Sequence, residues 1–118
     1  MIKLLKTIRK YWIVTTLLIL TGITIFSLVP LAELPSVPGT DKTHHIIAYS
    51  LLIFPAALRK SNYLPAIGLF LICWSGAIEL IQPFVNRYGE IQDLAANTIG
   101  LVSGLLAAKF ITWRFPIN

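Results

Sequence analysis

A run of nineteen residues without a charged side chain, from Tyr11 to Val29, constrains the fold of this chain more than any other feature. An α-helix needs about twenty predominantly apolar residues to cross the hydrocarbon core of a bilayer. The run is longer than the apolar stretch of about 7–15 residues in a cleaved signal peptide, and no Ala-x-Ala site follows it. We therefore expect it to remain in the protein as a membrane-spanning anchor.

The composition of the whole chain agrees with a membrane protein. Of its 118 residues, 56% are apolar and 13% are charged, whereas about a quarter of the residues in an ordinary soluble domain are charged. The mean hydropathy is +0.76. Three further apolar segments follow the first, so the predicted fold is all-α, an integral membrane four-helix bundle. It forms a single domain over residues 1–118, with spans at about 11–29, 42–58, 64–84 and 92–113.

The basic residues predict the orientation of these spans. With four spans, the two termini and the loop after residue 58 share one side of the membrane, and that side carries eight of the ten Lys and Arg residues. Cytoplasmic loops are enriched in Lys and Arg, so we expect both termini in the cytoplasm of a multi-pass protein of the cell (inner or plasma) membrane. Orientation and contact with anionic lipids then explain the net charge of +5, and we expect no nucleic-acid partner.

Polar residues recur at helical spacing where three of the apolar segments meet the outer side. Positions three or four apart share one face of a helix, which defines three polar faces: Asp41, His45 and Tyr49; Glu79 and Gln82; Asp93 and Asn97. A rise of about 1.5 Å per residue places these groups in one layer, in the outer third of the membrane. Ionisable groups inside a membrane face a partner or a wet cavity and mark functional sites by default. We therefore predict one polar site near the outer rim.

A stripe of small residues continues the polar face of the last segment. Gly100 and Gly104 follow Asn97 at intervals of three and four residues. Small residues at this spacing let helix backbones approach closely in lipid. The face that packs against a neighbouring helix is thus predicted to be the face that carries Asp93 and Asn97.

Several polar residues also have a simpler structural interpretation. Asn97 and Gln82 are equally explained as hydrogen bonds between helices. Asp41 is suited to cap the N-terminus of the second helix. Lys42 is expected to be a solvated charge, and His44 an interfacial residue.

Packing explains Glu79 least well among these residues. A Leu at this position would have a far lower free-energy cost of burial in a membrane. Ser75 lies one helical turn before it, on the same face. Arg87, in the short loop between the third and fourth segments, is the expected cation for Glu79 or Asp93 and a candidate to receive an anionic head group.

Taken together, these residues form an ordered pattern that resembles the VanZ-like family of bacterial membrane proteins. The pattern covers about residues 41–108 and reads Asp41-Lys42-x-x-His45-x-x-x-Tyr49, Glu79-x-x-Gln82, Arg87, and Asp93-x-x-x-Asn97-x-x-Gly100-x-x-x-Gly104. The resemblance implies a small multi-helix protein of the bacterial cell envelope, in a family whose founding members are linked to low-level resistance to the glycopeptide antibiotic teicoplanin. The family's polar positions correspond here to Asp41, Lys42, His45, Tyr49, Glu79, Gln82, Arg87, Asp93 and Asn97.

Three functions are compatible with such a site. The first is binding of a lipid-linked cell-wall precursor or a glycopeptide-type ligand at the outer leaflet, through all of these positions apart from Lys42. The second is a membrane-embedded enzyme that acts on a lipid head group by acid–base chemistry, with His45 oriented by Asp41 and Glu79 as the partner acid or base. The third is a transporter subunit or proton relay, for which four helices are few unless the chain forms a homo-oligomer.

We expect binding rather than catalysis, because the sequence has no activated nucleophile and no Gly-rich phosphate loop. One suitable His with scattered acids is a weak metal signature, so we expect neither a metal nor a cofactor. Membrane lipids are the expected general partners.

Overall fold

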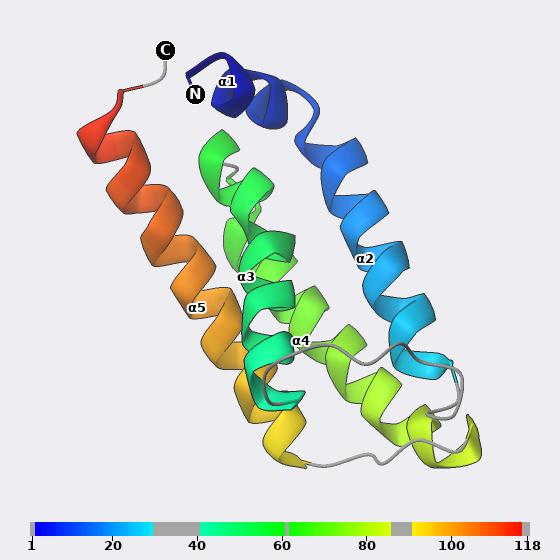
Figure 1. The fold of residues 1–118 in the computed structure, drawn as a ribbon. Coiled ribbons are helices and arrows are strands. Elements are labelled where there is room, and N and C mark those ends of the chain that lie inside the picture. Colours follow the sequence, from blue (N-terminus) through cyan, green and yellow to red (C-terminus); the bar gives the residue numbers. More distant parts are fainter. Residues whose placement is uncertain (1, 30–40, 61, 86–90, 117–118) are drawn as a thin grey trace.

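The computed structural model describes residues 2–29, 41–60, 62–85 and 91–116, and nearly all of them are helical (Figure 1). In chain order the helices are α1 (Ile2–Lys10), α2 (Trp12–Leu28), α3 (Asp41–Arg59), α4 (Leu64–Ile81), the 3-10 helix η2 (Gln82–Val85) and α5 (Ile91–Arg114). These described residues contain no strand, which confirms the predicted all-α class. The four predicted segments correspond to α2, α3, α4 with η2, and α5.

Two helical segments, Leu64–Val85 and Ile91–Arg114, are long and apolar enough to cross a membrane. The pair α1 and α2 adds a third when it is counted as one span with a bend of 84°. The 19 residues of α3 are less apolar because the helix begins with several charged and polar residues. Large apolar side chains stay exposed along the long helices, as contact with lipid requires; examples are Leu18, Leu51, Leu80 and Leu106.

The helices α3 and α5 run in the same direction and form the most extensive helix pair among the described elements (Figure 1). A Cβ atom added to Gly100 would lie 2.6 Å from the carbonyl oxygen of Ile46, and one added to Gly104 would clash with Ser50 and Ile53. The Ser50 hydroxyl donates a hydrogen bond of 2.9 Å to the carbonyl oxygen of Gly100. The predicted packing of the small-residue stripe is confirmed, and α3 is its neighbour.

The apolar core lies where α2, α3, α4 and α5 meet, and its buried members are Leu20, Tyr49, Leu52, Ile53, Leu71 and Leu101. At the exposed edge of this core, a hydrogen bond of 2.9 Å from Trp74 Nε1 to Thr24 Oγ1 joins α4 to α2. The helix α2 packs against α3, and α4 packs against α5, so the core residues join all four helices.

The basic N-terminal residues form a separate helix, α1, which the sequence analysis did not predict. Figure 1 shows α1 lying across the end of the molecule at which α3 and α5 finish. Leu5 anchors it there by packing into a cluster with Ala57, Leu58 and Ala108. The helix α1 is short and amphipathic. Its apolar face packs on the molecule, and this contact holds the Lys and Arg side chains of its other face at that end.

Candidate functional site

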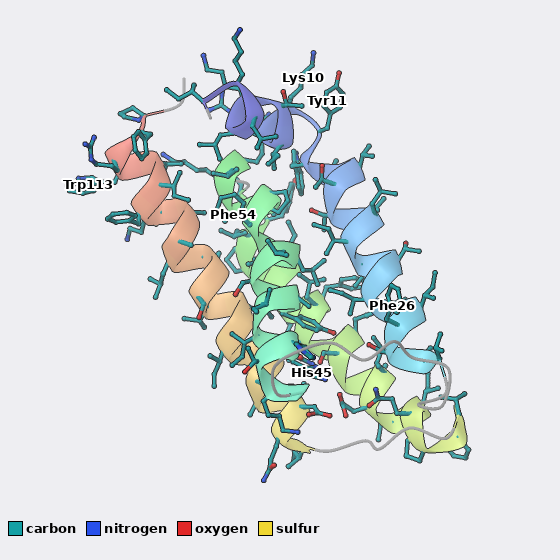
Figure 2. The ribbon with its side chains drawn as sticks, viewed as in Figure 1. Lys10, Tyr11, Phe26, His45, Phe54 and Trp113 are labelled. Atoms are coloured by element: carbon teal, nitrogen blue, oxygen red, sulfur yellow. The ribbon has the colours of Figure 1, made fainter. Side chains whose placement is uncertain are left out.

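Three helices bring polar side chains together near the end of the molecule at which α3 and α5 begin. Tyr49 and His45 come from α3, Ser75 and Glu79 from α4, and the buried residues Asp93 and Asn97 from α5. Figure 2 labels His45, which lies in this half of the molecule. The three polar faces predicted from helical spacing therefore meet in the interior, and we call this group the polar cluster.

Asn97 is the centre of the polar cluster. It is only 2% exposed, and its amide Nδ2 donates a hydrogen bond to Ser75 Oγ on α4. The amide oxygen Oδ1 lies 2.7 Å from Nδ1 of His45 on α3. Since that oxygen can only accept, His45 carries a proton on Nδ1 and donates it to Asn97. One amide thus joins all three helices.

The second nitrogen of His45, Nε2, lies 3.9 Å from Oδ2 of Asp93. This distance is too long for a hydrogen bond, and the two groups form an ion pair only when both nitrogens of the imidazole carry a proton. Asp93 is 2% exposed and forms its direct ion pair with Lys42, whose Nζ donates to the other carboxylate oxygen, Oδ1. A buried carboxylate is thus held between a lysine and an imidazole.

Lys42 corrects an expectation from the sequence. It was expected to be a solvated charge, but its ammonium group is bound to Asp93, and its side chain remains 36% exposed. The pairing follows from the parallel arrangement of α3 and α5, which places the first turns of both helices side by side. Lys42 therefore links the buried carboxylate to the surface.

Tyr49 and Glu79 extend the polar cluster toward the core. The Tyr49 side chain is buried and lies near Ser75 and Glu79 of α4. The Glu79 oxygen Oε1 is itself buried. Ser75, which accepts the hydrogen bond from Asn97, lies one helical turn before Glu79 on α4.

The hydrogen bond of Gln82 is made with α2 and not with the polar cluster. It is 1% exposed, and its Nε2 donates a hydrogen bond of 3.0 Å to the carbonyl oxygen of Ser27 at the end of α2. Its other polar atom, Oε1, is buried and has no hydrogen-bond donor in range among the residues that the structure describes. The contact with Ser27 supports the structural interpretation of Gln82 as a link between helices.

Two predicted site residues fall outside what the structure describes. Arg87 lies between α4 and α5 in the range 86–90, and the side chain of Asp41 is likewise outside the described set. The expected pairing of Arg87 with Glu79 or Asp93, and the expected orientation of His45 by Asp41, therefore stay predictions. In the described part of the cluster, Lys42 is the cation bound to Asp93.

The predicted set of ligand-binding residues lacks Ser75, a member of the polar cluster, and Lys42, which is bound to Asp93 at its edge. The sequence pattern places Ser75 on the correct face without a role and predicts Lys42 in solvent. Helical spacing could have identified both residues. Ser75 lies one turn before Glu79, and Lys42 lies one turn before His45. Over residues 2–29, 41–60, 62–85 and 91–116, no group of three or more His, Cys, Asp or Glu residues is arranged to hold a metal ion.

The chemistry available in the polar cluster is hydrogen bonding and proton transfer. The donors and acceptors are an imidazole, a phenol, a hydroxyl, an amide, two carboxylates and one ammonium group, all within or bordering the apolar core. In a medium of low dielectric constant such groups interact strongly with each other and with any polar ligand that reaches them.

Comparison with known proteins identifies the family of the chain. Neither the curated proteins nor the solved structures that were compared gave a similar protein. The model of the VanZ/LLP1 family, in contrast, matches residues 2–112, which include every residue of the polar cluster and all of α1. The resemblance predicted from the polar pattern is confirmed, and the chain belongs to the VanZ/LLP1 family.

Proposed function

We propose that this VanZ/LLP1 protein is a multi-pass protein of the cell membrane that binds a lipid-linked cell-wall precursor or a glycopeptide-type ligand at the polar cluster. In this proposal, α2, α3, α4 with η2, and α5 form a four-helix membrane bundle, and both termini are cytoplasmic. The polar cluster then lies toward the outer leaflet. Family membership and the apolar helices support the membrane location.

The distribution of charge supports this orientation. The end of the molecule that carries α1 holds eight cations, namely Lys3, Lys6, Arg9, Lys10, Arg59, Lys60, Lys109 and Arg114. Lys42 stands at the opposite end, in the first turn of α3. An excess of Lys and Arg marks the cytoplasmic side of a membrane protein, which supports an orientation with α1 in the cytoplasm and the polar cluster in the outer half.

The observation that carries the ligand proposal is the buried carboxylate of Asp93, bound to Lys42 and facing His45. A charged pair is costly to bury, and replacing it by apolar side chains is often neutral or stabilising for a fold. Stability alone is therefore a weak reason for this arrangement. An intramembrane cluster of ionisable groups is better explained by a ligand that uses it.

The position of Lys42 suggests how a ligand would engage. Its side chain is 36% exposed while its partner Asp93 is buried, so the ammonium group is the part of the pair that a ligand can reach. A phosphate or carboxylate group of the ligand would compete with Asp93 for Lys42. Tyr49 and His45 would then offer hydrogen bonds to neighbouring hydroxyl or amide groups.

A second candidate function is an enzyme that acts on a lipid head group. The observation in its favour is the geometry of His45, whose ring is held by Asn97 through Nδ1 and directed toward Asp93 through Nε2. An imidazole oriented on one side by an amide and facing a carboxylate is suited to proton transfer. Glu79 and Asp41 are the further candidate acids or bases.

Both candidates can be tested with the full chain in detergent or nanodiscs. Binding of a purified lipid-linked cell-wall precursor, and separately of teicoplanin, is measured for the wild type, His45→Ala and Asp93→Asn. The adjacent residue provides a matched control, because His44→Ala removes the same side chain from the same helix turn without touching Asn97. We expect at least tenfold weaker binding for the two site variants and unchanged binding for His44→Ala.

Mass spectrometry of the recovered ligand separates the two candidates. An unchanged mass after incubation supports binding, and a changed lipid head group that depends on His45 supports the enzyme. If the wild type and both site variants bind equally, the polar cluster is not the ligand site. A parallel measurement of teicoplanin susceptibility in cells that express these variants tests the link to resistance.

A further inference from the structure

A second candidate site lies at the opposite end of the molecule, where α1 turns into α2. A cavity of about 490 Å³ is lined there by five side chains from three helices: Lys6, Arg9, Lys10, Trp12 and Arg59. Four of the five are cationic. The acidic side chains that the structure describes, Glu79 and Asp93, belong to the polar cluster at the far end of the molecule.

An apolar cavity adjoins the basic one. It has a volume of about 330 Å³ and lies between one face of α2, from Trp12 to Leu20, and one face of α4, from Ala66 to Leu71. Its lining is almost entirely apolar side chains. Trp12 lines both cavities, so the basic and the apolar cavity border the same side chain.

The fold holds these parts in place. Leu5 fastens α1 to α3 and α5 by packing with Ala57, Leu58 and Ala108, and the 84° bend between α1 and α2 brings the cations of α1 over the end of the bundle. The basic groups are therefore positioned by an anchored helix. A preorganised group of cations loses less side-chain entropy on binding than a flexible tail does.

We propose that the two cavities together bind one anionic phospholipid, with its phosphate among Lys6, Arg9, Lys10 and Arg59 and an acyl chain between α2 and α4. Charge complementarity selects the head group, since basic pockets at helix ends on the cytoplasmic side bind anionic lipids. Arg side chains bind phosphate through two parallel N–H groups. Trp12 lies at the junction of polar and apolar parts, where tryptophan is favoured in membranes.

This site is separate from the polar cluster and does not depend on the function proposed for it. The lipid would bridge α1, α2, α3 and α4, the helices that line the two cavities. It would act as a structural or regulatory ligand of the basic end.

The test is native mass spectrometry of the full chain in detergent, titrated with dioleoylphosphatidylglycerol, dioleoylphosphatidylcholine or inorganic phosphate. We expect the anionic lipid to bind at least tenfold more tightly than the zwitterionic lipid, and inorganic phosphate to bind weakly because it lacks acyl chains. Equal binding of the two lipids would overturn the proposal. If inorganic phosphate binds as tightly as the anionic lipid, the proposal that an acyl chain lies between α2 and α4 is wrong, and the basic cavity binds phosphate alone.

Paired variants separate a defined site from general surface charge. The double variant Lys6→Gln/Arg59→Gln removes two cations from the basic cavity, and Lys109→Gln/Arg114→Gln removes two from the same end outside it. We expect at least tenfold weaker binding of the anionic lipid for the first pair only. Equal loss in both pairs would show that the surface potential, rather than the cavity, attracts the lipid.

The apolar cavity has its own pair of variants. Ala66→Phe places a ring in the cavity between α2 and α4, whereas Ala77→Phe adds the same ring to an exposed position of α4. We expect only Ala66→Phe to weaken lipid binding, by severalfold. Circular dichroism establishes that each variant is folded, and unchanged binding to folded Ala66→Phe would overturn the placement of the acyl chain.

Discussion

His45 and Asn97 face each other across the contact between α3 and α5, with Nδ1 of the imidazole 2.7 Å from Oδ1 of the amide. The same amide donates to Ser75 on α4, so the relationship fixes the ring orientation and links three helices at once. The parallel direction of α3 and α5 makes it possible, because it brings Lys42 opposite Asp93 and His45 opposite Asn97.

Asn97→Ala should destabilise the fold by about 1–2 kcal/mol, because it removes two interhelical hydrogen bonds, each worth about 0.6 kcal/mol on average in membranes. It would also leave a buried hydroxyl at Ser75. Thermal unfolding in detergent measures the change. The control is Thr98→Ala, which removes a hydroxyl bonded only to the carbonyl oxygen of Leu94 within α5. Equal stability of the two variants would contradict a central role for Asn97.

Gly100→Ala should destabilise the pair α3 and α5 by about 1–3 kcal/mol, the usual cost of overfilling a packed interface. The added methyl group would stand 2.6 Å from the carbonyl oxygen of Ile46. Gly68→Ala is the matched control on α4, because no atom lies within 4 Å of its added Cβ. There we expect no loss, or a gain of up to about 1 kcal/mol from helix propensity. Equal effects at the two glycines would argue against the close approach of α3 and α5.

Lys42→Met should destabilise the protein more than the double change Lys42→Met/Asp93→Asn does. The single change leaves a buried carboxylate without its bound cation, whereas the double change removes both charges. A double-mutant cycle followed by chemical or thermal unfolding should give a coupling energy of about 1–3 kcal/mol. Additive effects of the two substitutions would mean that the ion pair contributes nothing to folding.

The proposed orientation predicts which positions react with a membrane-impermeant maleimide in intact cells. In a Cys73→Ala background, Lys3→Cys should stay unlabelled until the membrane is permeabilised, because the basic N-terminal end is assigned to the cytoplasm. Ser36→Cys, between the first two predicted spans, should be labelled without permeabilisation. The reverse pattern would place the polar cluster on the cytoplasmic side.

Much of the helical architecture could be predicted from local patterns in the sequence. Apolar runs predicted the positions of α2, α4 and α5, because a helix that crosses a membrane requires a continuous run of apolar residues of sufficient length. The spacing of Gly100 and Gly104 predicted a close helix contact, because small residues one turn apart let two helix backbones approach. The pattern also placed Ser75, Glu79, Asp93 and Asn97 on inward faces. The helix α1 was missed because nine amphipathic residues next to a long apolar run give a weak signal.

Local spacing is enough to predict which face of each helix is polar, since that depends only on a repeat of 3.6 residues per turn. The partner that each polar group meets depends on how the helices pack. Lys42 was expected in solvent but binds Asp93, and His45 meets Asn97 on another helix. These pairings depend on the direction, rotation and axial register of α3 against α5, which are set by packing between distant segments and leave no local periodic signal.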